Sequence, residues 1–246
     1  SHIATCSEIR DMDNLSRRGF LFASSGAAAG SFVASGLADD TTGSSHANTG
    51  LVTGKPKPLR FKSIPGFLSA EQIAPHHSAH YGGALRGYTA ADTQLQSNIA
   101  AGTAIDPSAY GAIQRARTSK GNSVILHELY FDELTAKSNA PSPEVIAAIQ
   151  KRFGSVTKWA GDFQASAKAA TGWAMLVFHP VNGALYNVVS DEHAMGVLWM
   201  ATPLVVIDVY EHAFYVDYQN RKTDYIAKFM DHIDWQEVNR RFKDAS

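Results

Sequence analysis

The sequence predicts an α+β protein, and three observations support this prediction. Apolar residues recur with helical spacing in the first half of the chain, around residues 69–88 and 122–134. An Asn-Gly pair at 182–183 marks a turn and is followed by the strand-like segment ALYNVVS. The branched apolar run LVVI at 204–207 is typical of a buried strand. Both helices and strands are therefore expected.

The composition indicates a folded protein that does not bind nucleic acid. The 246 residues are 45% hydrophobic, enough for a full core in one domain or two small ones. The formal net charge is −1 and the basic residues are scattered, so no basic surface for DNA or RNA is expected. Cys6 is the only cysteine, which excludes an intrachain disulfide and a thiolate metal cluster. Ten histidines supply possible metal ligands.

Residues 1–38 are predicted to be an N-terminal extension with an export signal. Paired arginines in LSRRGFLF (15–22) precede a moderately apolar run to Ala38, a pattern that resembles a twin-arginine signal. A disordered or lipid-exposed tail is the alternative. The run is too short and too rich in small residues for a membrane span, so no stable membrane insertion is expected after cleavage. We expect the mature protein to be exported, to the periplasm or the extracellular space.

The first helix is predicted to begin near Ser69, whose hydroxyl can cap it, and to run to Tyr88. His76 and His80 are four residues apart and share one face of this helix, while His77 points elsewhere. This spacing alone is compatible with a functional or a structural role. The zincin motif needs a glutamate after the first histidine, and His77 stands there instead.

His127 lies in a second helical segment, NSVILHELYFDEL at 122–134. The apolar residues of this segment suit a buried helical face. A histidine on such a face is either a core side chain with a satisfied hydrogen bond or a metal ligand. The residues of this segment alone leave both interpretations open.

The second half of the chain begins with an amphipathic helix, predicted as one element over residues 141–163. Beyond the strand ALYNVVS lies the loop SDEHAMG at 190–196, which contains His193. The last strand, LVVID, ends at Asp208, and His212 follows four residues later. A carboxylate and an imidazole suit Mn, Fe or Zn, so the spacing does not name a metal. An ion pair or a contact at a helix start would explain this pair equally well.

The surrounding segment, DVYEHAFYVDYQNRKTDY at 208–225, resembles the C-terminal signature of iron and manganese superoxide dismutases. The similarity continues through IAKFMDHIDWQEVNRRF to Phe242. Upstream, TGWAMLVF at 171–178 matches the first strand of that family, and HHSAH at 76–80 matches its first histidine cluster. The resemblance covers about residues 58–242.

The resemblance implies an α+β fold in two parts. Residues 58–138 would form an N-terminal helical hairpin, and residues 139–246 a C-terminal domain with a three-stranded antiparallel sheet flanked by helices. The preceding residues 39–57 are polar and small as far as Thr53, so we expect a flexible linker there. The metal would lie between the two parts.

The resemblance also implies four metal ligands, His76 and His127 from the hairpin and Asp208 and His212 from the C-terminal domain. They would hold one Fe or Mn ion per chain. Val206 occupies a position that the family links to metal preference, and a β-branched residue there leans mildly towards iron. Three imidazoles, one carboxylate and a solvent molecule would make a five-coordinate site with room for a small anion.

Four further residues take catalytic or bridging roles by the same resemblance. His80 would line the substrate entrance. His193 would replace the glutamine that tunes the metal through a hydrogen bond to its solvent, unless it is an ordinary loop histidine. Iron-type relatives take that glutamine from the position of Ser123. Glu211 and Tyr215 would reach the partner's ligand histidine and gateway histidine, respectively, which predicts a homodimer.

The chain departs from the family at several aromatic positions. The family has a tyrosine four residues beyond the gateway histidine, where this chain has Ala84. Tyr81 or Tyr88 could substitute for it or pack elsewhere. Met175 and Phe131 stand where tryptophans are usual. Loss of the phenol should loosen control of proton delivery without removing the metal.

The implied activity is superoxide dismutation, in which superoxide is converted to oxygen and hydrogen peroxide at a mononuclear Fe or Mn site. Two alternatives stay open. The departures at the aromatic positions could open the pocket for peroxidase-like or oxidase-like chemistry on the same scaffold. The chain could also be a metal-binding protein with little turnover.

Overall fold

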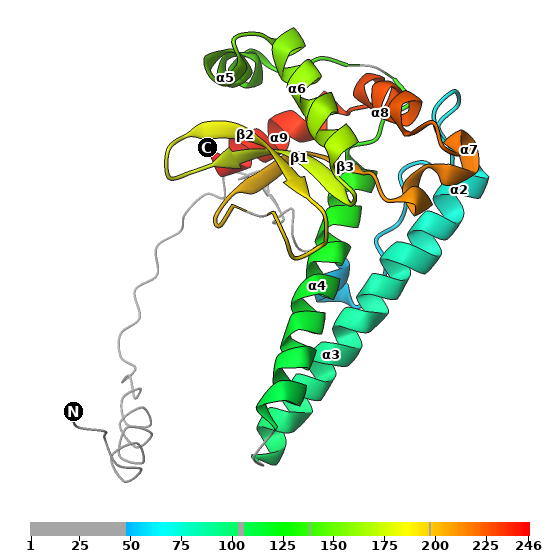
Figure 1. The fold of residues 1–246 in the computed structure, drawn as a ribbon, viewed down its shortest axis with the longest axis vertical. Coiled ribbons are helices and arrows are strands. Elements are labelled where there is room, and N and C mark those ends of the chain that lie inside the picture. The colour runs from blue at the N-terminus through cyan, green and yellow to red at the C-terminus, as the bar shows by residue number, and fades with distance from the viewer. Residues whose placement is uncertain (1–47, 103–105, 138, 197) are drawn as a thin grey trace, which may run out of the picture. The chain divides into compact units, whose positions relative to one another are not determined.

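The structure is a computed structural model and describes residues 48–102, 106–137, 139–196 and 198–246. The expected export signal lies outside the described residues. A helical hairpin is followed by a three-stranded antiparallel sheet with flanking helices, which confirms the predicted α+β fold (Figure 1). Within the described ranges, no helix is both long and apolar enough to cross a membrane.

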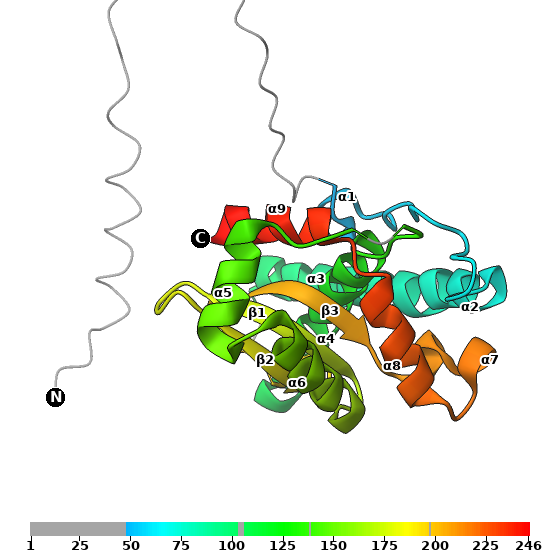
Figure 2. The same cartoon turned by 90° about the horizontal axis from the view of Figure 1, so that it is seen from above.

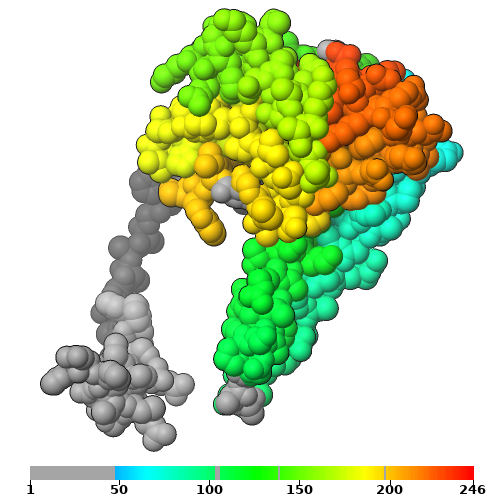
Figure 3. All heavy atoms as spheres, viewed as in Figure 1, coloured from blue at the N-terminus to red at the C-terminus, as the bar shows by residue number. Residues whose placement is uncertain are grey.

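Helices α3 (Gly82–Ala101) and α4 (Pro107–Asp132) lie side by side and form the hairpin (Figure 1). Gly102 ends α3 with φ 59°, and Asp106 caps α4 by accepting a hydrogen bond from the amide of Ala109. The buried residues of α4 begin only at Gly121. The other half of α4 stands clear of the sheet and its helices in Figure 3, so the core contacts of α4 lie near the C-terminal domain.

The helix predicted from Ser69 to Tyr88 is divided. Ser69 caps α2 (Ala70–Pro75) as predicted, by accepting a hydrogen bond from the amide of Gln72. The chain then forms a π-helix, η2 (His76–Tyr81), before α3 begins. Pro75 has no N–H group and interrupts the α-helical hydrogen bonds just before this wider turn. All three histidines of the HHSAH cluster therefore lie in π-helical geometry.

The segment predicted to be a flexible linker differs from the prediction where the structure describes it. Helix α1 (Gly50–Thr53) is capped by Thr49 and packs against α3 and α4. Gly50 is buried, and its amide donates a 2.7 Å hydrogen bond to Glu128 Oε1. The small, polar composition indicated a linker, but hydrogen bonds to the hairpin hold this segment in place.

The helix predicted over residues 141–163 is also two helices, α5 (Pro143–Phe153) and α6 (Val156–Ala169). Gly154 ends α5 with φ 84°, and the side chain of Ser155 accepts a hydrogen bond from the amide of Lys158 to cap α6. The apolar periodicity continues across this break, which explains why one helix was predicted.

The sheet has the order β2-β1-β3, with β1 (Trp173–His179) between β2 (Ala184–Ser190) and β3 (Thr202–Asp208). Helix α6 covers the sheet at β1 and β2 (Figure 2), whereas α4 packs against β3. At one end of the sheet, Trp173 of β1 lies opposite both Ser190 and Asp208. The register therefore brings the loop after β2 and the end of β3 to the same edge.

Four short or medium helices complete the chain: η3 (Glu211–Ala213), α7 (Tyr215–Tyr218), α8 (Lys222–Asp231) and α9 (Trp235–Ala245). Helix α7 packs against α2, and the amide of Ser69 donates to Asp217 Oδ2 at 2.7 Å. The Tyr218 hydroxyl donates to the carbonyl of Phe67 at 2.8 Å. These contacts hold the segment after β3 against the start of the hairpin.

Candidate metal centre

Four side chains from three separate segments of the chain meet between the hairpin and the sheet. His76 comes from η2, His127 from α4, Asp208 from the end of β3 and His212 from η3. One ligand atom from each lies within 4.8 Å of all the others. The structure thus brings together all four residues that the resemblance implies as metal ligands.

The three imidazoles converge on one carboxylate oxygen. Asp208 Oδ2 lies 3.0 Å from the Nε2 atom of His76, 3.3 Å from that of His212 and 3.6 Å from that of His127. His76, His127 and Asp208 are at most 1% exposed, and His212 is 20% exposed at its side chain. The buried Nε2 of His127 has no hydrogen-bond partner among the described residues.

An ordinary ion pair does not account for this arrangement, since one carboxylate does not need three imidazoles and a buried nitrogen without a partner is costly. A cation between these four atoms would satisfy all of them. Three nitrogen donors and one oxygen donor suit Fe, Mn or Zn. The residues therefore fit a mononuclear metal site.

The ligand side chains are oriented by hydrogen bonds on the side away from the centre. His127 Nδ1 donates to the carbonyl of Ser123 at 2.7 Å, which leaves the lone pair of Nε2 directed at the site. Asp208 Oδ1 accepts a hydrogen bond from the amide of Tyr210 at 3.0 Å. Ser123 thus takes part through its carbonyl group, whereas the family's iron-type members have a glutamine there.

Gln72 was missed by the sequence reasoning, although it links two parts of the site. This buried side chain donates from Nε2 to the carbonyl of His212 at 2.6 Å, and its Oε1 accepts a hydrogen bond from the amide of Val216 at 2.9 Å. Gln72 lies one helical turn before His76, so it sets the position of η3 relative to η2. Sequence patterns contain no signal for such a contact, because its partners are backbone groups about 140 residues away.

The protonation states of the ligands favour coordination. Burial lowers the pKa of His76, and it lowers the pKa of His127 to about 3. Burial acts to raise the pKa of Asp208, but hydrogen bonds from His212 and His76 outweigh it and hold that pKa below its usual range. At neutral pH, His76 and His127 are therefore neutral and Asp208 is ionised, as metal ligands must be.

We expect the metal-free protein to lose stability as the pH falls from 7 to 5. The unfolded chain protonates His127 near pH 6.5 while the folded chain keeps it neutral down to about pH 3, so the unfolded state binds more protons in this window. Between pH 7 and 5, His127 alone should remove about 2 kcal/mol from the free energy of unfolding. Urea denaturation at both pH values measures this change. A His127→Gln variant should show a pH dependence smaller by that amount, and an equal dependence in both proteins would contradict the assignment.

His80 lies at the exposed edge of the site. Its ring stacks on that of His212, with centroids 3.8 Å apart and an interplanar angle of 12°. The ring of Tyr210 also stacks on His212, at 5.2 Å and 14°. Burial and the neighbouring His212 lower the pKa of His80. The structure therefore places His80 beside a ligand and next to solvent.

His193 also lies beside the site, so it is not an isolated loop residue. Trp173 Nε1 donates to His193 Nδ1 at 3.0 Å, which leaves the proton of a neutral imidazole on Nε2. The His193 ring is 5.3 Å from the Tyr210 ring and 6.3 Å from the His127 ring, measured between centroids. Burial lowers the pKa of His193. Trp173 and Tyr210 were not predicted as site residues, although both lie in segments that resemble family motifs.

Glu211 and Tyr215 lie outside the ligand cluster, on η3 and α7. Glu211 is exposed, and Tyr215 is 50% exposed. Val216 beside them is 58% exposed. The surface next to His212 thus carries an acid, a phenol and an apolar side chain.

Neither nearby tyrosine replaces the phenol that the family has at the position of Ala84, which is itself buried. The Tyr81 hydroxyl donates to Glu128 Oε1 and accepts a hydrogen bond from the amide of Lys57, both at 2.7 Å. Tyr88 lies against Gly121 of α4. The Tyr81 hydroxyl is therefore engaged by Glu128 and Lys57, although its ring lies beside His127, and Tyr88 packs against α4.

Met175 and Phe131, the other two positions at which the chain departs from the family, have different surroundings. Met175 is buried in β1 opposite Val206. Phe131 packs against His76, with ring centroids 4.9 Å apart. Phe131 thus keeps an aromatic ring at the site, whereas Met175 supplies an aliphatic side chain.

The fold and the site together define a protein with a candidate metal centre of three histidines and one aspartate, contributed by a helical hairpin and an α+β domain. Residues 141–241 match the family of iron/manganese superoxide dismutases, C-terminal domain. The chain is similar to "Superoxide dismutase [Mn] 2" of Haloferax volcanii, with 34% identity over 191 residues, 77% of this chain and 94% of that protein. It is 36% identical to "Superoxide dismutase [Fe]" of Aquifex pyrophilus over 195 residues, 76% of this chain and 89% of that protein. The chain belongs to the iron/manganese superoxide dismutase family.

Proposed function

We propose that this protein is a superoxide dismutase with one Fe or Mn ion held by His76, His127, Asp208 and His212. The observation that carries the proposal is the convergence of three buried or half-buried imidazole nitrogens on one carboxylate oxygen. Relatives at 34% and 36% identity bear the names of a manganese and an iron superoxide dismutase. The metal, when bound, supplies the one-electron redox chemistry that the reaction needs.

The chain's own residues would supply charge and protons. The carboxylate of Asp208 offsets part of the positive charge of the metal in a site with little solvent. His80 lies between the site and solvent, where it can guide the anionic substrate and deliver protons. His193 can donate a hydrogen bond from Nε2, because Trp173 occupies Nδ1. Control of proton delivery would rest on these two histidines, since the family's phenol is replaced by Ala84.

We expect purified protein loaded separately with iron and with manganese to consume superoxide rapidly with at least one of the metals. Metal content measured on the same samples should approach one ion per chain. Metal binding without superoxide consumption would contradict the proposal and favour a metal-binding protein with little turnover. Turnover of an organic substrate with peroxide or oxygen would favour peroxidase-like or oxidase-like chemistry. The same experiment identifies the metal, for which Val206 leans mildly to iron.

The proposal includes a homodimer. His80, Glu211 and Tyr215 are exposed next to the site, and Val216 adds apolar surface. A second copy placed on this surface would cover Val216 and let Glu211 and Tyr215 reach the partner's histidines. Sedimentation of the full chain should give the mass of two chains, and a Val216→Lys substitution should shift the equilibrium to monomers because it buries a charge. An unchanged mass in that variant would place the interface elsewhere.

We also propose that residues 1–38 direct export by a twin-arginine route, so that the protein acts in the periplasm or outside the cell. The support for this is the sequence pattern of paired arginines and the apolar run that follows. Lysine substitution of Arg17 and Arg18 should retain the protein in the cytoplasm of an expressing bacterium. Export of that variant at the normal level would contradict the route.

A further inference from the structure

The segment before the first family helix lies directly against the hairpin that carries two of the ligands. We define residues 49–60 as the N-terminal strap. Its backbone makes three hydrogen bonds to hairpin side chains. Gly50 N donates to Glu128, Lys57 N donates to Tyr81, and the Lys57 carbonyl accepts from His77 Nε2, each at 2.7 Å. We propose that this strap positions the ligands His76 and His127 for metal binding.

The connection to His127 runs through one buried carboxylate. Glu128 is 8% exposed, and its Oε1 accepts hydrogen bonds from both the Gly50 amide and the Tyr81 hydroxyl. Glu128 follows the ligand His127 directly in α4. Glu128 therefore holds the backbone of α4 next to His127. The strap supplies one of the two hydrogen bonds that Glu128 Oε1 accepts.

A second connection uses the ring of Tyr81. This residue is 1% exposed, and its ring stacks on that of His127 with centroids 6.2 Å apart and an angle of 27°. Its hydroxyl accepts a hydrogen bond from the strap and donates one to Glu128, so both bonds hold the ring in this position. Tyr81 is also the last residue of the π-helix that begins at His76. The strap thus holds the side chain of Tyr81. This side chain packs against the ligand His127, and Tyr81 is the last residue of the π-helix that contains the ligand His76.

Gly50 is the position where the strap approaches most closely. A Cβ atom there would lie 3.0 Å from the Tyr81 hydroxyl oxygen, 3.1 Å from Glu128 Oε1 and 3.1 Å from a methyl group of Leu85. Contacts this short require the neighbours to move. The Gly50→Ala substitution would therefore press directly on the two residues through which the strap acts.

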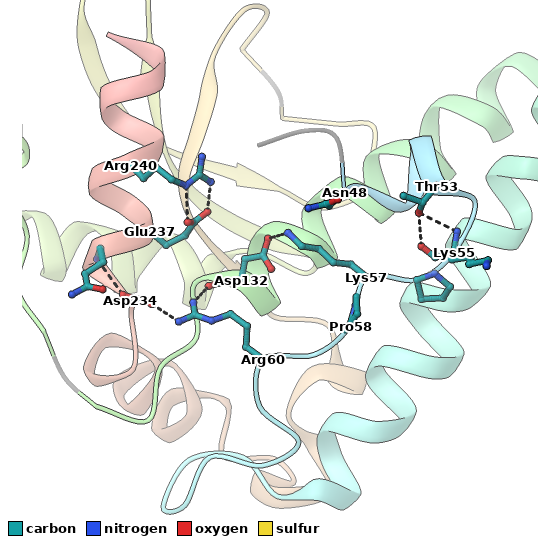
Figure 4. Close-up of a pocket in the computed structure, with 12 residues that line it drawn as sticks. Asn48, Thr53, Lys55, Lys57, Pro58, Arg60, Asp132, Asp234, Glu237 and Arg240 are labelled. Carbon is teal, nitrogen blue, oxygen red and sulfur yellow. Dashed lines mark hydrogen bonds and ion pairs between the residues drawn. The ribbon is translucent and has the colours of Figure 1, made fainter. Parts of the chain in front are cut away.

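Ion pairs hold the far end of the strap (Figure 4). Lys57 Nζ lies 2.5 Å from Asp132 Oδ2 in the last turn of α4, and Arg60 donates to the carbonyl of the same residue and lies 2.8 Å from Asp234 Oδ2. These pairs line a cleft of about 940 Å³. Lys57 pairs with Asp132 and Arg60 pairs with Asp234, so the cleft lies where the strap is attached to α4 and to the cap of α9.

Tyr81 and Glu128 are positioning residues under this proposal, since neither contacts the metal ligand atoms. The inference rests on metal binding by the chain and not on superoxide turnover. We would compare full-length wild type with Tyr81→Phe and Gly50→Ala, and with Tyr88→Phe as the matched control on α3. Iron affinity is measured by chelator competition, and the geometry of the ferric site by its electron paramagnetic resonance spectrum.

We expect Tyr81→Phe and Gly50→Ala each to lower iron affinity roughly 10-fold, as loss of an outer-shell contact does, and to change the ferric spectrum. Tyr88→Phe should match the wild type in both measurements. If one of the two strap variants does not fold, the other decides the question. Lower thermal stability with unchanged affinity and spectrum would overturn the proposal and make the strap merely structural. Failure of the wild type to bind iron or manganese would instead contradict the proposed function.

Discussion

His127→Ala should yield a folded protein with almost no bound metal. The substitution removes one of four ligands and leaves Asp208 with two imidazoles. We expect metal affinity to fall by more than the roughly 10–100-fold seen when only an outer-shell partner is lost. Superoxide consumption should disappear with the metal. Stability should fall as well, by about 2–4 kcal/mol, because a buried side chain is replaced by a cavity.

The matched control is His179→Ala, a histidine at the opposite end of β1 from Trp173. Metal analysis of both variants after identical loading should show the normal content in the control and nearly none in His127→Ala. Circular dichroism of His127→Ala should retain the helical spectrum of the wild type. Full metal occupancy in His127→Ala would exclude this residue as a ligand.

Arg241→Met should destabilise the protein by about 3–5 kcal/mol, because it leaves the buried carboxylate of Glu133 without its cation. Arg241 and Glu133 are 4% and 0% exposed, and their charged atoms are 2.6 Å apart. Arg241 also donates to the carbonyl groups of Leu204 and Leu129, while Glu133 accepts from the amide of Val206. This pair therefore joins α4, β3 and α9 behind the metal site.

Arg240→Met supplies the control, since Arg240 is adjacent, carries the same charge and pairs with Glu237 and Asp244 at a side-chain exposure of 43%. We expect it to cost less than about 1 kcal/mol, the usual value of an exposed pair. Denaturation in guanidinium chloride measures both variants under the same conditions. Similar decreases in the free energy of unfolding in the two variants would show that the contribution of the Arg241–Glu133 pair does not depend on its burial.

Local patterns predicted the elements well where a single feature sets them. Ser69 caps its helix as the sequence indicates, and the run LVVI lies within β3 with Asp208 at its end. The missed boundary between α5 and α6 had its own signal in Gly154 and Ser155, which form a helix end followed by a cap. The prediction of a single helix followed the continuous apolar pattern and passed over the helix end at Gly154 and the cap at Ser155.

The sequence was enough to name His76, His127, Asp208 and His212, because the segments that carry them resemble family motifs. It did not show that the Tyr81 hydroxyl bonds to Glu128 and the strap or that Gln72 holds η3. It also assigned residues 39–57 to a flexible linker, whereas Gly50–Thr53 form α1. In each case the decisive contact joins residues far apart in the chain, such as Gly50 with Glu128.

By itself the sequence predicted the α+β class, the family and the four residues that meet at the candidate metal centre. The class follows from periodicity and turn signals, which act between neighbouring residues, whereas the family and the four residues follow from the resemblance of their segments to family motifs. Only the tertiary structure decided which way the ligand atoms face, which tyrosines remain near the metal centre and what the strap contacts. Those properties depend on hydrogen bonds and packing between segments up to 174 residues apart, and no local pattern encodes them.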